Sequence, residues 1–155
     1  MSASLIKTAI FLVIVPGTVT VVIPYLLMGR HAEVCQPLGP VGFLPIALGA
    51  ALALRSSWDF ATVGRGTPAP VDPPKVLVAR GYYRYVRNPM YVGVVLILLG
   101  ESILFGSVTL LEYALVVWLL FHLFVLLYEE PTLRRKFGPS YVEYCKEVGR
   151  WIPRL

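Results

Sequence analysis

Residues that carry much of enzyme chemistry are scarce in this 155-residue chain, which has 2 cysteines, 2 histidines and 9 acidic residues. Neither Cys35 nor Cys145 has a metal-ligand spacing, and the topology derived below puts them on opposite sides of a membrane, which excludes a disulfide between them. With only His31 and His122 available, a histidine-based nucleophilic triad is not expected. The sequence thus predicts neither a metal site nor such a triad.

Motifs that bind nucleotides are missing as well. No G-x-G-x-x-G follows a strand and opens a helix, no G-x-x-x-x-G-K is present, and Gly64-Arg65-Gly66 is too short for a dinucleotide fingerprint. The net charge of +5 comes from basic residues that flank apolar segments rather than from a cluster on one soluble face. Nucleic acid is therefore not an expected partner.

Apolar sequence is what the chain has in abundance, because 57% of its residues are hydrophobic and only 15% are charged. This composition is typical of an integral membrane protein, and runs of about 20 apolar residues can cross a bilayer as helices. We expect a single all-α membrane domain, residues 1–155, with four transmembrane helices at about residues 8–27, 38–54, 90–105 and 108–128. The first run is too long for a cleaved signal core.

Three details refine these spans. Pro16 and Pro24 should kink the first helix. The second span is short, so Arg55 would have to reach toward the interface. The last two spans form a helical hairpin around a tight turn at Gly106-Ser107.

The distribution of lysine and arginine sets the orientation. Six of the 14 basic residues lie between residues 55 and 87 and six lie after residue 130, whereas the loop at residues 28–37 holds one. Because basic loops stay in the cytosol, both of these segments and both termini should face the cytosol. We expect a multi-pass protein of the plasma membrane of a prokaryote.

Two segments lie outside the predicted spans. Between residues 55 and 78, the runs Gly64-Arg-Gly-Thr-Pro-Ala-Pro70 and Asp72-Pro-Pro74 predict a cytosolic connecting loop, either a plain connector or a lid. After Glu130, apolar residues recur every three or four positions and Gly138-Pro139 interrupts them, which predicts an amphipathic helical tail at the membrane surface. The tail would either anchor the protein or cover a site. Its apolar residues are Leu133, Phe137, Tyr141, Tyr144, Val148 and Trp151.

Two adjacent acidic residues, Glu129 and Glu130, end the fourth predicted span. Neighbouring carboxylates at a desolvating boundary repel one another unless a cation or several donors lie close, and a helix C-terminus disfavours anions further. We therefore favour a functional pair, whose repulsion a cationic ligand would relieve, over a pair that simply ends the membrane segment. At the other mouth of the hairpin, Arg84 and Arg87 could pair with these acids or meet a ligand carboxylate.

Other ionisable and small residues lie within the spans. Glu101 falls near mid-depth of the third helix and His122 lies two turns before the acidic pair, so neither should face lipid. Glu101 either pairs with His122 or Arg55, or lines a polar cavity for an acceptor headgroup. Gly93 and Gly100 should allow close helix packing.

The motifs, taken together, resemble those of a known group of membrane enzymes. The chain reads Gly-x-Tyr-Arg-x-x-Arg-Asn-Pro-Met-Tyr at residues 81–91, then a membrane hairpin, then Glu-Glu at 129–130 and Phe-Gly-x-x-Tyr-x-x-Tyr at 137–144. In this order the motifs resemble the isoprenylcysteine carboxyl methyltransferase and phospholipid methyltransferase superfamily. The resemblance covers roughly residues 64–153, the expected catalytic region.

This resemblance implies S-adenosylmethionine as the cofactor, bound on the cytosolic side. A carboxylate would accept hydrogen bonds from its ribose hydroxyls or amino group, and an aromatic wall would hold its sulfonium by cation–π contact. The implied cofactor-binding residues are Lys75, Val76, Leu77, Val78, Tyr83, Arg87, Asn88, Pro89, Met90, Tyr91, Glu129 and Glu130.

The sequence leaves two acceptors open, a prenylcysteine carboxylate and a phospholipid amine. Asn88 occupies the place where prenylcysteine enzymes have a histidine, and Val125 the place of their substrate-binding arginine. The strings Asn-Pro-Met-Tyr and Leu-Tyr-Glu-Glu-Pro are closer to the phospholipid amine branch, whereas the Phe-Gly-x-x-Tyr-x-x-Tyr tail is closer to the prenylcysteine branch.

We therefore predict methyl transfer to a lipophilic or amphiphilic acceptor at the cytosolic membrane face, either a prenylcysteine-like carboxylate or a phospholipid-like amine. The proximity of donor and acceptor would supply much of the rate enhancement. An amine acceptor would also need a general base, for which Glu101, His122 and Glu130 are the candidates; together with Glu129 they are the expected catalytic residues. Two alternatives remain: a nicotinamide-dependent membrane reductase, because the hairpin also resembles that of sterol reductases, and a non-catalytic membrane module.

Overall fold

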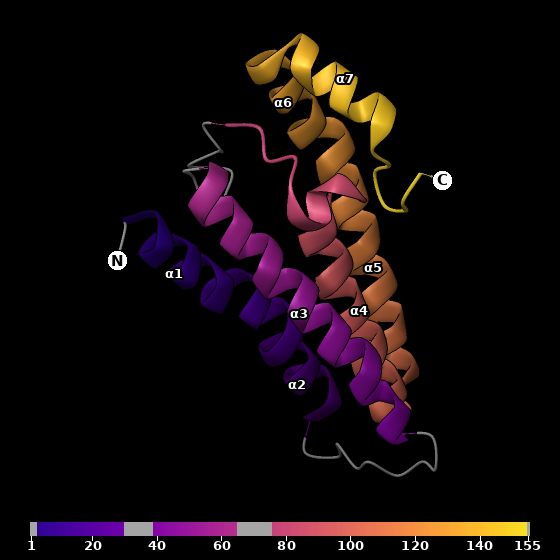
Figure 1. Cartoon of the computed structure of the whole chain (residues 1–155). Coiled ribbons are helices and arrows are strands. Elements are labelled where there is room, and N and C mark those ends of the chain that lie inside the picture. The colour runs from indigo at the N-terminus through magenta and orange to yellow at the C-terminus, as the bar shows by residue number, and fades with distance from the viewer. Residues whose placement is uncertain (1–2, 30–38, 65–75, 155) are drawn as a thin grey trace.

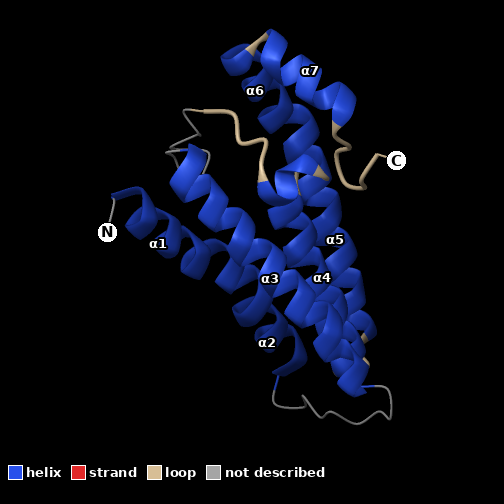
Figure 2. Ribbon diagram, viewed as in Figure 1, coloured by secondary structure: helices blue, strands red, loops and turns tan. Residues whose placement is uncertain are grey.

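Helices make up the regular structure of the computed structural model, which describes residues 3–29, 39–64 and 76–154. The α-helices are α1 (Ala3–Gly17), α2 (Ile23–Met28), α3 (Phe43–Asp59), α4 (Pro89–Leu104), α5 (Val108–Phe124), α6 (Glu130–Phe137) and α7 (Pro139–Glu147). Short π and 3-10 turns are η1 (Thr18–Val22), η3 (Gly39–Gly42), η4 (Phe60–Gly64), η5 (Gly81–Arg84) and η6 (Val125–Glu129). No strand is drawn in these described ranges (Figure 2), so the all-α prediction is confirmed.

Three continuous helices of the described chain are long and apolar enough to cross a membrane: Thr8–Met28, Gly39–Gly64 and Val108–Phe137. Pro89–Leu104 is apolar but shorter, and it lies beside α5 in a helical hairpin (Figure 1). Large apolar side chains on the outer faces are more than half exposed, among them Val13, Leu48, Leu115 and Leu120. Such a surface is stable against lipid. The prediction of a helical membrane protein is confirmed.

The first spanning helix departs from regular α geometry between its two prolines. α1 passes into the π turn η1, and α2 begins with Pro24 in its first turn. Thr20 Oγ1 donates a hydrogen bond to Pro16 O at 2.8 Å. Because proline lacks the amide proton that an α-helix needs, a wider turn is a common adjustment near it.

The second spanning helix is longer than predicted. An end at residue 54 was expected, but α3 continues to Asp59 and η4 extends it to Gly64. Two hydroxyls of this extension bond back to the helix itself, Ser57 Oγ to Ala53 O and Thr62 Oγ1 to Trp58 O, each at 2.7 Å. These bonds satisfy the two hydroxyls inside a helix that the sequence pattern did not extend this far. The glycine- and proline-rich part of the predicted connecting loop, residues 65–75, lies outside the described residues.

The fourth span and the start of the tail form one continuous helix, so the prediction of an end at residue 128 was wrong. α5 passes through η6 into α6, and Pro131 lies in the first turn of α6. Pro131 has no amide proton to donate, and the wider π turn before it adapts the helix to the missing hydrogen bond. Glu129 and Glu130 therefore lie inside a helix, and the expected helix-dipole penalty does not apply. The chain does turn at Gly138, with φ of 54°, where a break was predicted.

Glycines let α3 and its η3 extension pack backbone to backbone against α4. A Cβ added at Gly93 would lie 2.6 Å from Gly49 O, and one added at Gly100 would lie 2.6 Å from Gly42 O. Side chains have no room at these crossings, and small residues at such contacts are a usual way for membrane helices to associate. The predicted role of Gly93 and Gly100 in close packing is confirmed.

The hairpin of α4 and α5 holds a small apolar core made of Val94, Leu98, Ala114 and Val117. Its turn lies at Gly106 and Ser107 as predicted, and Ser107 Oγ accepts the N–H of Leu110 at 3.3 Å. At the opposite end of the hairpin, η5 and the start of α4 lie near α6, α7 and the C-terminal segment (Figure 1). The sequence motifs are gathered at this end.

Candidate functional site

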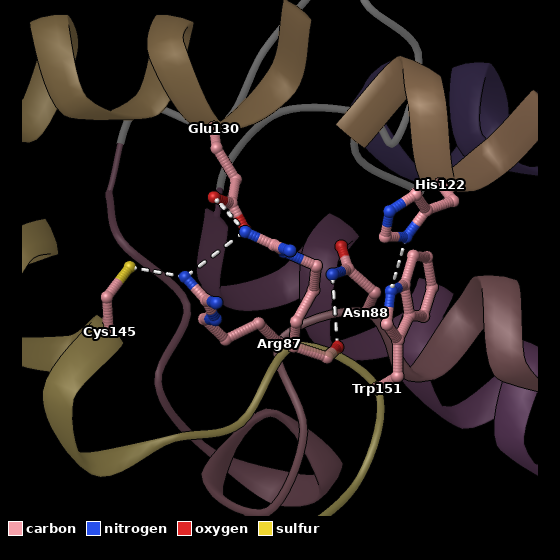
Figure 3. Close-up of polar contacts among 7 residues, drawn as sticks. Arg87, Asn88, His122, Glu130, Cys145 and Trp151 are labelled. Carbon is pink, nitrogen blue, oxygen red and sulfur yellow. Dashed lines mark hydrogen bonds and ion pairs between the residues drawn. The ribbon is translucent and has the colours of Figure 1, made fainter. Parts of the chain in front are cut away.

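The C-terminal segment is tied to the residues that precede the hairpin. Val86 and Gly149 form an isolated parallel bridge, and the Arg87 N–H donates to Gly149 O at 2.9 Å. Asn88 Nδ2 donates to Arg150 O at 3.2 Å (Figure 3). The chain after α7 therefore packs over the mouth of the hairpin where the motif residues lie.

The apolar side chains predicted for the tail face the protein. Tyr141, Tyr144 and Val148 are buried together, and Leu77, Leu133, Phe137 and Cys145 pack against them. The amphipathic period of the tail is confirmed, and its apolar face covers the loop before the hairpin. Of the two roles left open for the tail, this packing supports the covering of a site.

Glu130 is buried and its charge is balanced by two arginines. Arg150 makes a bidentate contact, with Nε at 2.6 Å from Oε1 and Nη2 at 2.9 Å from Oε2, and Arg87 Nη1 lies 3.3 Å from Oε1 (Figure 3). Arg87 also donates to Cys145 Sγ. The hydrogen bond to Glu130 raises the pKa of Arg150, so this guanidinium stays charged. Glu130 thus joins the tail to the hairpin.

Glu129 is adjacent in sequence but has a different environment. Its Oε2 accepts a hydrogen bond from the Tyr91 hydroxyl at 2.9 Å. No arginine, lysine or histidine of the described chain forms an ion pair with it. The Tyr91 ring packs against Phe121 and Trp151, at centroid distances of 4.6 and 6.5 Å. The carboxyl group is held in place by a phenol, and no cation of the described chain pairs with it.

Tyr83 is a buried tyrosine within electrostatic reach of Glu129. Its ring lies 5.4 Å from that of Phe60, and its carbonyl accepts a hydrogen bond from the Tyr144 hydroxyl at 2.6 Å. Burial raises the pKa of the Tyr83 hydroxyl well above its ordinary value, and the negative charge of Glu129 adds to this. The phenol therefore stays neutral and offers an aromatic surface next to a carboxylate.

His122 is engaged by the C-terminal segment. Trp151 Nε1 donates to His122 Nδ1 at 3.1 Å (Figure 3), and the imidazole stacks on Trp118 at 5.5 Å. With Nδ1 accepting a hydrogen bond, a neutral imidazole carries its proton on Nε2. The predicted pair between His122 and Glu101 does not form.

Glu101 lies near the far end of α4, ten residues after Tyr91. At a rise of about 1.5 Å per residue, this places it roughly 15 Å along the helix from the hairpin mouth. Its Oε2 atom is buried without a hydrogen-bond partner in the described structure. Arg55, the other partner predicted for it, lies near Asp59 instead. The structure does not bring Glu101 to Glu129.

The remaining predicted cofactor residues line the same end of the molecule, except that Lys75 lies outside the described residues. Val78 and Pro89 are buried, Val76 is exposed, and Met90 Sδ accepts a weak hydrogen bond from Ser57 Oγ at 3.4 Å. Their predicted contacts with a cofactor stay predictions.

Sequence reasoning missed polar groups on α3. Ser56 and Asp59 are 0% and 1% exposed, and Ser56 Oγ and Asp59 Oδ2 lack a hydrogen-bond partner in the described structure. The signal was an ionisable residue close to an apolar run, but the helix was taken to end before it. Arg150 and Trp151 were also missed as site residues, because only their spacing within the tail was considered.

These side chains suit a positively charged ligand. Glu129 offers a carboxyl group that no described cation pairs with, and Tyr91, whose hydroxyl bonds to it, brings an aromatic ring to the same place. No group of three His, Cys, Asp or Glu residues within the described ranges is placed to hold a metal ion. The chemistry that fits is the binding of an organic cation by charge, hydrogen bonds and aromatic faces.

Comparisons with known proteins bear on this site. A family model described as phospholipid methyltransferase matches residues 39–140. The protein-S-isoprenylcysteine O-methyltransferase of Schizosaccharomyces pombe is 42% identical over 81 residues, which are 52% of this chain and 34% of that protein. Protein-S-isoprenylcysteine O-methyltransferase A of Arabidopsis thaliana is 35% identical over 78 residues, 50% of this chain and 39% of that protein.

The chain thus spans about a third to two fifths of the length of these curated relatives. The family model, however, runs from the start of the second spanning helix through the hairpin and α6 into α7. It includes Tyr83, Tyr91, Glu129 and Glu130, which the structure gathers at one end of the hairpin. This helical membrane protein belongs to the phospholipid methyltransferase family.

Proposed function

We propose that the protein transfers a methyl group from S-adenosylmethionine to a nucleophile on a lipophilic or amphiphilic acceptor. The family match supports methyl transfer as the reaction, and the curated relatives carry the name of O-methyltransferases. The apolar spanning helices support an acceptor that arrives from the membrane. The excess of basic residues around the site end supports placing it at the cytosolic face.

The observation that carries the proposal is the environment of Glu129. This carboxylate is partly buried, accepts one phenolic hydrogen bond and lacks a described cation, so a ligand with positive charge would complete it. S-adenosylmethionine fits this donor set, because it combines a sulfonium cation with ribose hydroxyls and an amino group that can donate hydrogen bonds. When bound, it supplies an electrophilic methyl group.

The residues of the chain divide the work of binding. Tyr91 fixes the orientation of the Glu129 carboxylate, and Tyr83 and Tyr91 would supply aromatic rings for cation–π contact. The tail, held by Glu130, covers the hairpin mouth, where it would limit the access of water. Aligning acceptor and donor in such a place can supply several kcal/mol of the barrier reduction, about 7 or more in favourable cases.

The residues of the site leave two classes of acceptor. Val125, at the position expected for a carboxylate-binding arginine, is 1% exposed in an apolar environment and offers no charge. The relatives named above act on isoprenylcysteine by name, whereas the matching family model is named for phospholipids. Either a carboxylate or an amine of a membrane amphiphile is consistent with this. Cytosolic termini and a prokaryotic plasma membrane stay predictions from the sequence.

The cofactor part of the proposal is tested by titration calorimetry of the detergent-solubilised protein with S-adenosylmethionine. Glu129→Gln should weaken binding at least about tenfold, because a charge-assisted contact is worth roughly 1.5–3 kcal/mol. Glu143→Gln is the matched control, since Glu143 is 64% exposed in the tail and pairs only with Lys146. Unchanged affinity in a folded Glu129→Gln variant would contradict the role of this residue.

The acceptor is identified by offering methyl-labelled cofactor with a native lipid extract and, separately, with a short prenylcysteine. The incubation in which labelled product forms identifies the acceptor as a lipid or as a prenylcysteine. A protein that binds no S-adenosylmethionine and labels nothing would point to the non-catalytic module, and an absorbance change of a reduced nicotinamide would point to the reductase.

A further inference from the structure

A pocket of about 340 Å³ lies where η5 packs against α3, at the end of the hairpin that gathers the motif residues. Neither Glu129 nor Tyr91 lines it, so the pocket does not include the carboxyl group proposed to hold the methyl donor. Its volume falls within the range of about 300–1,000 Å³ that small-molecule sites have. The residues that line it are Arg55 of α3 and, from the segment before the hairpin, Gly81, Tyr82, Arg84 and Tyr85.

The lining is rich in hydrogen-bond donors that the described protein does not use. Arg84 is exposed and forms no ion pair within the described chain, although the acidic pair was a predicted partner. Arg55 Nε lies 3.8 Å from Asp59 Oδ2, which is beyond hydrogen-bond distance, and the Arg55 side chain is 57% exposed. The phenols of Tyr82 and Tyr85 are exposed as well. These groups can all donate to a ligand.

One carboxylate lies behind the pocket, and it does not cancel the charge of the two arginines. Asp59 is 1% exposed and is not a lining residue. A Cβ built on Gly81 would collide with Asp59 Oδ2, which shows that the Gly81 backbone packs against this carboxylate. A single buried carboxylate beside two guanidinium groups leaves an excess of positive charge. Because a cleft lined by charges of one sign concentrates their field, the pocket favours an anion.

Two guanidinium groups and two phenols suit a phosphate group. Arginine presents its N–H donors in a planar fork that matches the oxygens of a phosphate, and a phenol can donate one further hydrogen bond. Arg55 comes from α3 and Arg84 from η5, so the donors reach the pocket from two separate elements. An anion bound there would connect the second spanning helix to the segment before the hairpin.

The surface around Arg55 indicates the source of the phosphate. Leu54, the preceding residue, is 62% exposed, and Trp58, one helical turn after Arg55, is 54% exposed. All three belong to the helix Gly39–Gly64, which is long and apolar enough to cross a membrane. Exposed tryptophan and tyrosine near the end of a spanning helix are typical of the headgroup level of a bilayer. An anion in the pocket would thus have an apolar surface beside it, which suits acyl chains.

We propose that this pocket binds the phosphate of an anionic phospholipid of the adjoining leaflet, and that Arg55 and Arg84 hold it. The acyl chains of the lipid lie along the apolar face of α3, beside Leu54 and Trp58. Basic pockets between spanning helices are a recognised way to bind anionic headgroups. A zwitterionic headgroup gains less in such a pocket, because it carries its own cation next to the phosphate. The inference does not depend on methyl transfer.

The test is native mass spectrometry of the full-length protein, purified in detergent, stripped of lipid and titrated with phosphatidylglycerol. Phosphatidylcholine with the same acyl chains tests the need for a net negative charge, and inorganic phosphate as a competitor tests the need for a lipid. The wild-type protein should bind one phosphatidylglycerol molecule about tenfold more tightly than phosphatidylcholine. Inorganic phosphate at the same concentration should not displace it.

Arg84→Gln gives the cleanest variant, because Arg84 is exposed and its removal breaks no ion pair of the described chain. It should weaken phosphatidylglycerol binding about tenfold, as expected for the loss of a hydrogen bond to a charged group, and Arg55→Gln should do the same. Arg80→Gln is the matched control, since Arg80 is exposed in the same segment but does not line the pocket. Its affinity should stay within about threefold of the wild-type value in physiological salt, which screens charges outside the pocket.

The proposal is overturned if phosphatidylcholine binds as tightly as phosphatidylglycerol, or if Arg84→Gln binds phosphatidylglycerol like the wild-type protein. It is also overturned if Arg80→Gln weakens binding as much as Arg84→Gln, because diffuse charge would then hold the lipid. Displacement by inorganic phosphate would assign the pocket to a soluble anion instead of a lipid. The unfolding midpoint of Arg84→Gln without lipid should match that of the wild-type protein, so that lost binding is not lost fold. A protein that binds no S-adenosylmethionine leaves this test intact.

Discussion

Glu129 and Glu130 are neighbours in one helix, yet they belong to two regions with opposite electrostatics. Glu130 is 4% exposed and receives a bidentate contact from Arg150 and a further contact from Arg87. Glu129 receives one phenolic hydrogen bond from Tyr91. A carboxylate whose charge is balanced within the protein holds structure together, whereas one that is left unbalanced is available to a cation.

The comparison separates two roles that the sequence treats as one. A pair of acids at the mouth of a hairpin suggests joint action on a ligand, but the π turn at Val125–Glu129 and the following α-helix point the two side chains at different partners. Glu130 fastens the tail over the site, and Glu129 faces the aromatic groups within it. We therefore expect their variants to fail in different ways.

The largest expected effect is the loss of stability in Glu130→Gln. The substitution leaves Arg87, whose side chain is 9% exposed, without its carboxylate, and breaking a buried pair from one side costs about 3–5 kcal/mol. Thermal unfolding in detergent should show a clear drop in midpoint, and limited proteolysis should cut the tail. Glu143→Gln, in the same tail, should behave like the wild-type protein. A stable, protease-resistant Glu130→Gln variant would mean that Glu130 does not fasten the tail.

Gly138→Ala should have the next largest effect, because it disturbs the tail without touching any charge. Gly138 has φ of 54° and ψ of −130°, a conformation that side-chain-bearing residues avoid, and an added Cβ would meet nothing within 4 Å. The cost is therefore backbone strain alone, about 1–3 kcal/mol. Thermal unfolding should show this loss of stability as a lower midpoint. The affinity for S-adenosylmethionine, measured below the unfolding transition, should stay within a few fold of the wild-type value. Equal loss in affinity would mean that the turn itself shapes the donor site.

Much of this architecture follows from the sequence, and the failures have a common physical cause. Apolar runs, the Gly106-Ser107 turn and the packing role of Gly93 and Gly100 were predicted because each depends on local composition. The ends of two helices were wrong because polar residues near those ends make contacts within the fold that a sequence does not display. Ser57 bonds to its own helix, and Asp59 lies against a glycine more than twenty residues later.

The site shows the same division. Tyr83, Tyr91, Glu129 and Glu130 were predicted as site residues from the motifs, and the structure places them at one end of the hairpin. Which of the two acids carries a compensated charge could not be predicted, because that depends on Arg150, twenty residues beyond Glu130 in a segment that folds back. Long-range ion pairs leave no periodic trace in a sequence.

The smallest effect is expected from Tyr91→Phe, which tests whether Glu129 differs in role from Glu130. The variant keeps the ring that packs against Phe121 and removes only the hydroxyl that donates to Glu129. Loss of one such hydrogen bond is worth about 0.5–1.5 kcal/mol, so donor affinity should fall roughly three- to tenfold as Glu129 loses its fixed orientation. Tyr144→Phe is the matched control, because it removes a hydroxyl bonded to the Tyr83 carbonyl at the tail contact. That control should lower the unfolding midpoint slightly and leave affinity nearly unchanged. If Tyr91→Phe lowered stability and spared affinity, Glu129 would be a structural residue like Glu130, and the contrast between the two acids would fail.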